Sequence, residues 1–274
     1  MIDFEEGRIS IRLSEGTYYA LQRDIADFCF VSNDGSYNEN GFYNTILPAL
    51  HKNRILERTK LRRIFEKRFS DKIKPQYKNE LLNELDDIFN LVQFDDKITK
   101  YHQAKVDIRL SKNNMKLFAD VFSLLETQKI PKSSYIRNLL NQYACMRTDD
   151  REYLCYENVY EEIMDAADEH QVLEFSSKFG TEDFIPITVD LCCYDNEFYV
   201  IGIVPEYEMF FLKSYRLCEF KKYKIKFINY EVGNSIYEEA ETVISEFGYY
   251  NKPPFCLKGN DNGIIRCEKA EKLS

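Results

Sequence analysis

The segment from Lys213 to Lys226 contains the two kinds of side chain that bind unpaired nucleic acid. Its sequence, KSYRLCEFKKYKIK, interleaves lysines and one arginine with tyrosines and a phenylalanine. Cations contact phosphates, and aromatic rings stack on unpaired bases. The pattern therefore predicts a single-strand binding site that includes Lys213, Tyr215, Arg216, Lys222 and Lys224. The alternative interpretation is a lysine-rich strand whose charges prevent aggregation.

Side chains that could perform catalysis are sparse. The three histidines are His51, His102 and His170, and none stands beside a serine or cysteine in a recognisable nucleophile setting. The chain contains neither a GxGxxG motif nor a P-loop, which are the common signatures of nucleotide cofactor binding. The eight cysteines form no CxxC pair, so we expect reduced thiols rather than a metal site. A protein that is not an enzyme and needs no cofactor is expected.

Positive charge is concentrated in one segment of an acidic chain. Eleven lysines and arginines face three acidic residues between Lys52 and Lys78, whereas the whole chain has a formal charge of −9. Such segregation is typical of a protein that meets an anion with one face only. We place a basic ridge at Arg58, Arg62, Arg63 and Lys67. A solvated helix face that happens to be basic is the alternative.

Two short stretches carry the same amphipathic pattern. Residues 8–14 read RISIRLS and residues 105–111 read KVDIRLS, and both alternate aliphatic with polar side chains. This period of two predicts a strand with one buried face. Ser14 and Ser111 then stand at the expected N-caps of amphipathic helices, since a short side-chain oxygen accepts from the first free N–H groups.

The similarity continues beyond the strands and defines a repeated unit. Apolar positions of the first helices match at an offset of 97 residues, and those of the second helices match at an offset of 93. The unit is a strand, a helix, a turn and a helix, over residues 8–50 and 105–146. A lone strand cannot satisfy its own backbone groups, so we expect the two strands to pair antiparallel.

The second copy, VDIRLSKNNMKLFADVFSLLETQKIPKSSYIRNLLNQY, resembles a ribbon-helix-helix unit, and the first copy resembles it less closely because Pro48 is expected to interrupt its second helix. Family members pair two chains into a ribbon that enters the DNA major groove, and here one chain would supply both halves. Asp107 departs from this pattern, because an acid suits a phosphate-rich groove only if it reads a cytosine amino group. A ribbon that serves only folding or dimerisation is the alternative. The resemblance assigns these outward ribbon residues: Arg8, Ser10, Arg12, Lys105, Asp107 and Arg109.

The second half of the chain has a different pattern of residues. An acidic helix follows Asp149, and five strand-like runs between residues 171 and 230 are separated by turns, which predicts a small antiparallel barrel. This order resembles a WYL domain, an Sm-like or SH3-like barrel. The runs EFYVIG and SYRLCEF stand where the family has its two motifs. The resemblance therefore adds Tyr199 to the site and makes Arg216 the counterpart of a family arginine. Cys218 and Glu219 depart from the second motif.

These expectations define an α+β protein with three regions. Two ribbon-helix-helix units form an intrachain pseudo-dimer over residues 1–150, with a basic helical insertion at 51–104. A WYL domain covers 151–230, and a C-terminal helix and tail cover 231–274. The sequence has no apolar run of the roughly 20 residues that span a bilayer and no secretory signal, so a cytoplasmic protein without membrane contact is expected.

The combination resembles the WYL-domain accessory proteins of type VI-D CRISPR systems. That resemblance implies binding of single-stranded RNA and stimulation of an RNA-guided ribonuclease, the CRISPR effector. A homodimer is the expected assembly. One alternative is a transcriptional regulator that binds duplex DNA and senses a ligand through its WYL domain; another is a protein-interaction module.

Overall fold

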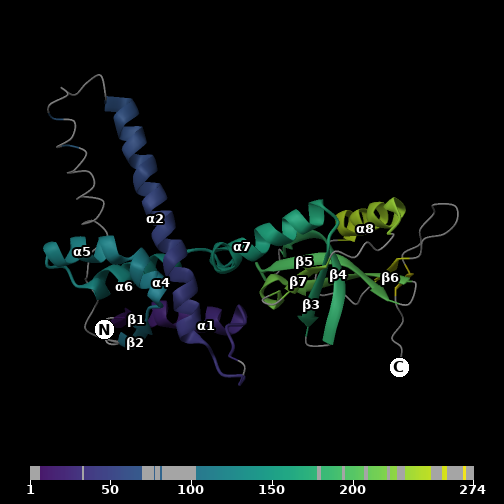
Figure 1. Cartoon of the computed structure of the whole chain (residues 1–274), viewed down its shortest axis with the longest axis horizontal. Helices are drawn as coiled ribbons and strands as arrows, with labels where there is room; N and C mark the ends of the chain where they lie inside the picture. The colour runs from purple at the N-terminus through teal and green to yellow at the C-terminus, as the bar shows by residue number, and fades with distance from the viewer. Residues whose placement is uncertain are drawn as a thin grey trace. The chain divides into compact units, whose positions relative to one another are not determined.

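Two antiparallel sheets organise the chain, one in each half (Figure 1). The computed structural model of the 274-residue chain describes residues 7–32, 34–69, 77, 81, 103–177, 180–192, 195–206, 209–220, 223–226, 232–247, 255–257 and 268–269. The chain divides into two units, Met1–Met146 and Arg147–Ser274. Helices and strands occur in both, so the α+β prediction is confirmed.

The first unit is built on a two-stranded ribbon. Strand β1 (Arg8–Ser14) pairs antiparallel with β2 (Gln103–Arg109) within the same chain. Alternate side chains are buried, among them Ile11 and Ile108, because a strand turns every second residue to the same face. The predicted pairing is confirmed, although the second strand begins and ends two residues earlier than expected.

Each strand leads into helices, as the repeat predicts. Ser14 and Ser111 are N-caps, and their hydroxyl oxygens accept hydrogen bonds from the backbone N–H of Thr17 and of Asn114, both at 3.2 Å. In the first repeat the helices are α1 (Glu15–Asp27) and α2 (Glu39–Phe69). In the second they are α4 (Lys112–Leu117), α5 (Ala119–Thr127) and α6 (Lys132–Cys145).

The core of the first unit comes from the apolar faces that the repeat predicts. These ten positions of α2 and α6 are all buried: Phe42, Tyr43, Ile46, Leu47, Leu50, Tyr135, Ile136, Leu139, Leu140 and Tyr143. Phe42 makes edge contacts with Tyr43 and with Tyr143, an arrangement that aromatic rings prefer. Burial of equivalent positions in both repeats explains why they share one hydrophobic pattern.

Pro48 does not interrupt the second helix of the first repeat, contrary to the prediction. Helix α2 runs through it to Phe69 and extends beyond the other helices of the unit (Figure 1). Proline lacks the N–H that would bond the carbonyl of the residue four positions earlier, which is Asn44. Here the Asn114 Nδ2 donates to the Asn44 carbonyl oxygen at 2.9 Å. This side chain replaces the missing backbone donor.

The second unit begins with an acidic helix and continues as a sheet. Helix α7 (Thr148–Asp168) buries Ile163 and Ala167 and exposes Glu161 and Glu162, as expected, and it packs against β4. The strand order is β7-β3-β4-β5-β6-β8-β9, and all of these pairings are antiparallel. Their bounds are β3 (Val172–Ser177), β4 (Gly180–Leu191), β5 (Phe198–Glu206), β6 (Met209–Arg216), β7 (Tyr223–Lys226), β8 (Phe255–Leu257) and β9 (Glu268–Lys269). A short 3-10 helix, Leu217–Glu219, follows β6.

Within the described residues the sheet is open rather than a closed barrel, which corrects the prediction. Its two edges are β7 and β9, and no pairing of described strands joins them. The edge strands have four and two residues, too few to complete the ladder that closure requires. The long strand β4 pairs with β3 through its first half and with β5 through its second half, with a bulge between Pro186 and Thr188. Such a bulge bends the strand.

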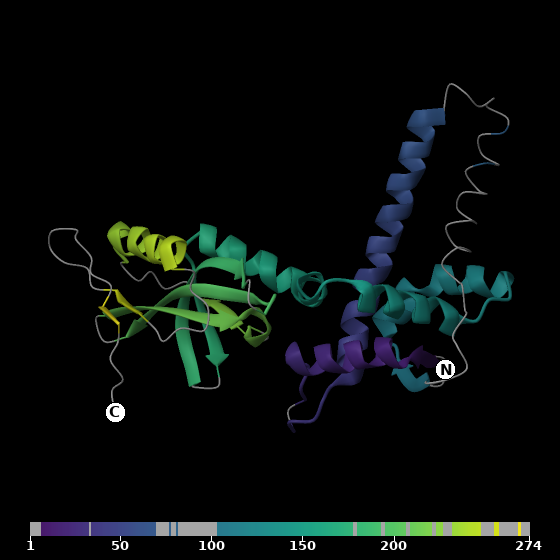
Figure 2. The ribbon, with the colours of Figure 1, turned by 180° about the vertical axis from the view of Figure 1, so that it is seen from behind.

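Helix α8 (Asn234–Phe247) covers one side of this sheet, as Figure 2 shows from behind. Its residues Ile236, Ala240 and Val243 join a core with Ile201 and Leu212. The helix starts at Asn234, within the region predicted to hold a C-terminal helix. The C-terminal region therefore contributes both this helix and strand β8, which pairs with β6.

Part of the predicted basic insertion lies outside the described residues. Its residues 51–69 are the continuation of α2 to Phe69. Farther along the insertion the structure describes Tyr77 and Leu81, which are helical.

Candidate nucleic-acid interface

The outer face of the β1–β2 ribbon is lined with charged side chains. All six residues assigned to it are exposed, while the residues between them are buried. The register sets them in three facing pairs: Arg8 with Arg109, Ser10 with Asp107, and Arg12 with Lys105. Four cations therefore surround one acid on a surface open to solvent.

Two neighbouring cations contact the Asp107 carboxylate. Arg8 Nη2 donates to Asp107 Oδ2 at 2.9 Å, and Lys105 Nζ lies 3.9 Å from the same oxygen. Hydrogen bonds hold the pKa of the Asp107 carboxyl below its usual range; the one from Arg8 has the largest effect, and the one from Ser10 follows. The carboxylate is therefore ionised at neutral pH, with 33% of its side chain exposed.

Ser10 and Asp107 are equivalent residues of the two repeats, and the register places them directly opposite each other. Arg12 and Arg109 are equivalent as well, and so are Arg8 and Lys105. The pseudo-two-fold axis of the ribbon thus passes between Ser10 and Asp107. The four cations obey this symmetry, and the central pair, one neutral and one acidic, breaks it.

Residues of α2 fix the end of the ribbon that carries Arg109. Asn40 Oδ1 accepts a hydrogen bond from the Arg109 backbone N–H at 2.9 Å, and Asn44 Oδ1 accepts one from the Ser111 backbone N–H at 2.7 Å. Because the backbone is held, the side chain of Arg109 leaves it at a defined point. These contacts fix the backbone from which the Arg109 side chain projects.

The basic ridge on α2 is partly described. Arg63 and Lys67 are exposed, as are Lys52 and Lys60 on the same helix. The side chains of Arg58 and Arg62 lie outside the described residues. Exposed aliphatic residues accompany these cations, with Ile55, Leu56 and Ile64 about half exposed at 49%, 48% and 52%. The ridge provides a second cationic surface in the first unit.

In the second unit, Lys213 on β6 is held by acidic side chains. Its Nζ lies 2.7 Å from Glu206 Oε1 and 3.3 Å from Glu182 Oε2, and its side chain is only 19% exposed. Lys226 on β7 is held in the same way by Glu174 and Asp183, at 2.8 and 2.6 Å. A phosphate would have to compete with two carboxylates for each of these ammonium groups.

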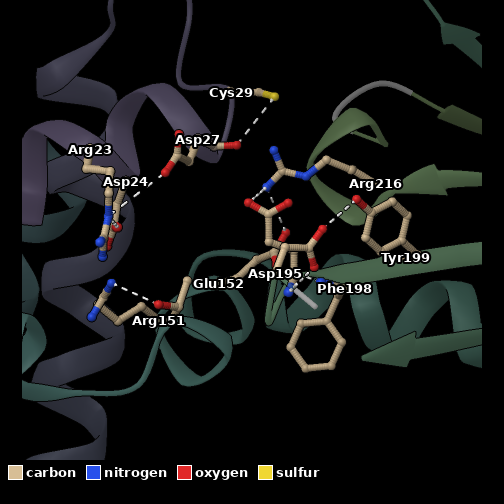
Figure 3. Close-up of polar contacts among 12 residues, drawn as sticks. Arg23, Asp24, Asp27, Cys29, Arg151, Glu152, Asp195, Phe198, Tyr199 and Arg216 are labelled. Atoms are coloured by element: carbon tan, nitrogen blue, oxygen red, sulfur yellow. Dashed lines mark hydrogen bonds and ion pairs between the residues drawn. The ribbon is translucent and has the colours of Figure 1, made fainter. Parts of the chain in front are cut away.

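Arg216 stands beside two carboxylates of its own unit (Figure 3). Its Nη2 lies 2.7 Å from Glu197 Oε1 and 3.9 Å from Glu152 Oε1. Glu152 is fully buried, and its Oε2 accepts the Phe198 backbone N–H at 2.7 Å. Burial raises the pKa of Glu152 to about 7, although the hydrogen bond from Phe198 and the charge of Arg216 act in the opposite direction.

The two tyrosines placed in the predicted binding site are buried. Tyr199 is 3% exposed and donates to Asp195 Oδ2 at 2.9 Å; Tyr215 is 8% exposed and donates to Glu182 Oε2 at 2.6 Å. The Tyr215 ring packs edge-on against Phe175 and Phe184. These rings therefore form part of the core and offer no face to a base. Lys224 on β7 is exposed, and Lys222 lies outside the described residues.

The acidic partners in the second unit were not predicted from the sequence. Glu152 lies in the helix expected to be an acidic surface, yet it is fully buried, and Glu182 and Glu206 lie in or beside predicted strands. Pairing between distant charges cannot be derived from helical or strand periodicity.

Comparison with known proteins gives a structural match. No protein-family profile matches the chain, and no curated protein matches it. A solved structure described as "Crystal structure of a CRISPR Cas-related protein" is similar, with a TM-score of 0.61 and 13% identity, over 93% of this chain and 75% of that chain. At this identity the likeness shows a shared fold.

Two further findings concern metal ions and membranes, and both apply to the described residues. These residues include no group of three or more histidine, cysteine or acidic side chains that could hold a metal ion. None of their helices is long and apolar enough to cross a membrane.

Proposed function

We propose that this protein is a non-enzymatic accessory protein that binds single-stranded RNA through the outer face of its ribbon and stimulates the RNA-guided ribonuclease of a type VI-D CRISPR system. The observation that carries the RNA-binding part is the group of four exposed cations on a ribbon of defined register. The shared fold with a CRISPR Cas-related protein supports the CRISPR setting.

We assign the first unit to the ribbon-helix-helix proteins and the second to the WYL domains. The first assignment is supported by two strand-helix-helix repeats whose strands pair within one chain. The second is supported by the sheet after an acidic helix, in which the two motif residues Tyr199 and Arg216 face each other on neighbouring strands. One chain then supplies the ribbon for which the family normally uses two.

The ribbon, rather than the sheet of the second unit, is the proposed RNA contact. Lys213, Arg216 and Lys226 are each held by two carboxylates of their own unit, whereas the ribbon has four cations for one acid. Neutralising phosphates and releasing counterions supplies much of the affinity for nucleic acid. The exposed lysines and arginine of the ridge on α2 extend this cationic surface along the helix.

Single-stranded RNA fits the centre of the ribbon better than duplex DNA does. Asp107 would face paired bases and two rows of phosphates in a duplex groove, and like charges repel. Unpaired bases of RNA expose their hydrogen-bond donors and can approach a carboxylate edge-on. The net charge of −9 also opposes non-specific binding along a duplex.

Fluorescence anisotropy across a salt series tests the proposal. Labelled single-stranded RNA, single-stranded DNA and duplex DNA of mixed sequence are titrated with the protein and with the double variant Arg12→Ala/Arg109→Ala. We expect tight, salt-sensitive RNA binding that the variant weakens by about one order of magnitude. The slope of log affinity against log salt should fall by about 0.7 for each phosphate that the variant no longer neutralises.

A matched variant controls for the removed charge. Lys116→Ala/Lys129→Asn removes two exposed cations of the same unit outside the ribbon, and asparagine suits position 129 because its φ is 58°. This variant should bind RNA almost as tightly as the unmodified protein. Equal weakening in both variants, or no RNA binding at all, would contradict the proposal.

Duplex DNA binding is the second candidate, because the outer face of a two-stranded antiparallel ribbon has the shape that enters a major groove. A strong preference for one duplex sequence in the same titration would favour a transcriptional regulator. Failure to bind any nucleic acid would favour a protein-interaction module.

Stimulation and assembly need separate measurements. Cleavage of a labelled target RNA by a type VI-D effector with its guide should be faster when this protein is added, and the ribbon variant should lose the effect. Light scattering should give the mass of a homodimer. If the cleavage rate is unchanged while RNA binding is observed, the proposed stimulation of the effector is rejected and the proposed RNA binding is not.

A further inference from the structure

We infer that Asp107 gives the ribbon a preference for unpaired guanine, bound by its Watson–Crick edge at the pseudo-two-fold centre beside Ser10. This inference rests on the proposed function, because it requires single-stranded RNA on the outer face of the ribbon. It adds a base preference and a named residue to a surface otherwise defined by charge.

Asp107 is suited to contact a base by its position. It is the one acid among the six outward ribbon residues, and it lies at the middle of the three facing pairs. Arg8 at 2.9 Å and Lys105 at 3.9 Å both contact the Oδ2 atom. A phosphate is repelled by the carboxylate and drawn to the cations around it, which leaves the centre of the face to a base.

The chemistry of an ionised carboxylate selects among the four bases. A carboxylate only accepts hydrogen bonds, and its two oxygens offer about four lone-pair sites in total. Guanine presents two adjacent donors on its Watson–Crick edge, the N1–H and the N2 amino group, which match the two oxygens. Arg8 and Lys105 then lie on the side where the O6 acceptor of guanine can meet a cation.

The other bases offer a poorer match to the Asp107 carboxylate. Adenine and cytosine each present one amino group beside a ring nitrogen that is itself an acceptor. Uracil presents a single N–H between two carbonyl oxygens, which the carboxylate repels. The expected order of affinity is guanine first, adenine and cytosine next, and uracil last.

The asymmetry of the central pair makes this a single site. Ser10 occupies the equivalent position in the other repeat and carries no charge, so a base meets one carboxylate and one hydroxyl. A ribbon with the same residue in both repeats would treat the two directions of an RNA strand alike. Asp107 therefore also gives the bound strand a direction.

The test uses short single-stranded RNAs that differ at one central position among otherwise adenine and uracil residues. Anisotropy titrations compare guanine, adenine, cytosine, uracil and inosine, which lacks the N2 amino group. We expect guanine to bind about ten-fold more tightly than uracil, as for other two-bond side-chain contacts to a base. Inosine should lose a large part of that advantage.

Three variants isolate the carboxylate. Asp107→Ser makes the central pair symmetric, and it should abolish the guanine preference while tightening overall binding, because a negative charge is removed. Asp107→Asn should also lose the preference. Ser10→Asp should keep it and weaken binding to every RNA. Thermal unfolding of each variant establishes that the ribbon is folded.

The possible results separate this inference from the proposed function. RNA binding with equal affinity for all central bases, or a guanine preference that persists in Asp107→Ser, overturns the role of Asp107 and leaves RNA binding intact. Absence of binding to every RNA rejects the proposed function itself. A preference for cytosine in duplex DNA alone would also overturn the inference, since the amino group of cytosine is the donor open to an acid in the major groove.

Discussion

Asn44 of α2 and Arg137 of α6 make the same contact in the two repeats. Asn44 Nδ2 donates to the Arg109 carbonyl oxygen, and Arg137 Nε donates to the Arg12 carbonyl oxygen, both at 2.9 Å. Arg12 and Arg109 are themselves equivalent ribbon residues. The two repeats therefore use different side chains to hold corresponding points of the ribbon, and the pseudo-symmetry extends from the fold to single hydrogen bonds.

The two contacts should differ in their contribution to stability. Asn44→Ala removes the donor to the Arg109 carbonyl, the acceptor of the Ser111 N–H and one of the two acceptors of the Asn114 amide, so we expect a loss of about 2–4 kcal/mol in the free energy of unfolding. Arg137→Ala removes the hydrogen bond to the Arg12 carbonyl and should cost about 0.5–1.5 kcal/mol. Urea unfolding followed by circular dichroism measures both. Equal losses would count against the network around Asn44.

Pro48 and Asn114 should be energetically coupled. Asn114 supplies the donor that Pro48 withholds from the Asn44 carbonyl, so Asn114→Ala leaves that carbonyl without it. In a Pro48→Ala background the backbone N–H of residue 48 can make the ordinary helical bond. The double-mutant cycle should therefore give a coupling free energy of about 1 kcal/mol, with Asn114→Ala costing less when residue 48 is alanine. Strictly additive losses would show that the replacement has no energetic role.

Local periodicity made the first unit predictable. The alternation in RISIRLS and KVDIRLS predicted both strands, Ser14 and Ser111 marked both N-caps, and the matched apolar positions indicated the buried core. Antiparallel pairing followed because a single strand cannot satisfy its own backbone. The Ser10–Asp107 pair then followed from the register once the strands were paired.

Contacts between distant residues were not predictable in this way. The hydrogen bond that replaces the one missing at Pro48 comes from Asn114, which is far away in the sequence. The prediction of a site around Lys213 and Arg216 did not include the acids that other elements bring to it, such as Glu152 on α7. A count of charges within one segment cannot show which of them meet a partner when the chain folds.

The buried pair of His51 and Tyr135 should make the first unit sensitive to acid. His51 Nδ1 lies 2.6 Å from the Tyr135 hydroxyl oxygen, and burial, then the charge of Arg54, lowers the pKa of His51 below its usual 6.5. The unfolded chain therefore binds a proton more readily than the folded chain, so the free energy of unfolding should fall as pH decreases through 6.5. Thermal unfolding between pH 7.5 and 5.5 measures this effect.

Replacement of both partners separates this pair from other acid effects. His51→Phe removes the titrating ring but takes away the partner of the Tyr135 hydroxyl, at a cost of about 1–3 kcal/mol. His51→Phe/Tyr135→Phe removes both polar groups, so it should recover much of that loss and show a weaker pH dependence than the unmodified protein. An unchanged pH dependence in the double variant would exclude His51 as its source.

Glu152 should produce the opposite pH dependence in the second unit. Burial raises its pKa from an ordinary 4.5 to about 7, so the folded chain holds the proton more tightly than the unfolded chain. Glu152 therefore contributes to the free energy of unfolding at low pH, and this contribution is lost as pH rises from about 4.5 to 7. The loss is at most roughly 3 kcal/mol. Glu152→Gln keeps an acceptor for the Phe198 N–H and cannot ionise. Its stability relative to the unmodified protein should rise with pH across this window.

Arg216→Ala provides the complementary change at the same site. It removes the cation beside Glu152 and Glu197, so charged Glu152 loses compensation and the second unit should be less stable at pH 8 than at pH 5. In the Glu152→Gln background the same substitution should cost less, because only Glu197 then loses its partner. RNA affinity measured on folded Arg216→Ala should stay close to that of the unmodified protein, since the proposed contact is on the ribbon. A large loss of RNA affinity in a folded Arg216→Ala would return the binding site to the second unit.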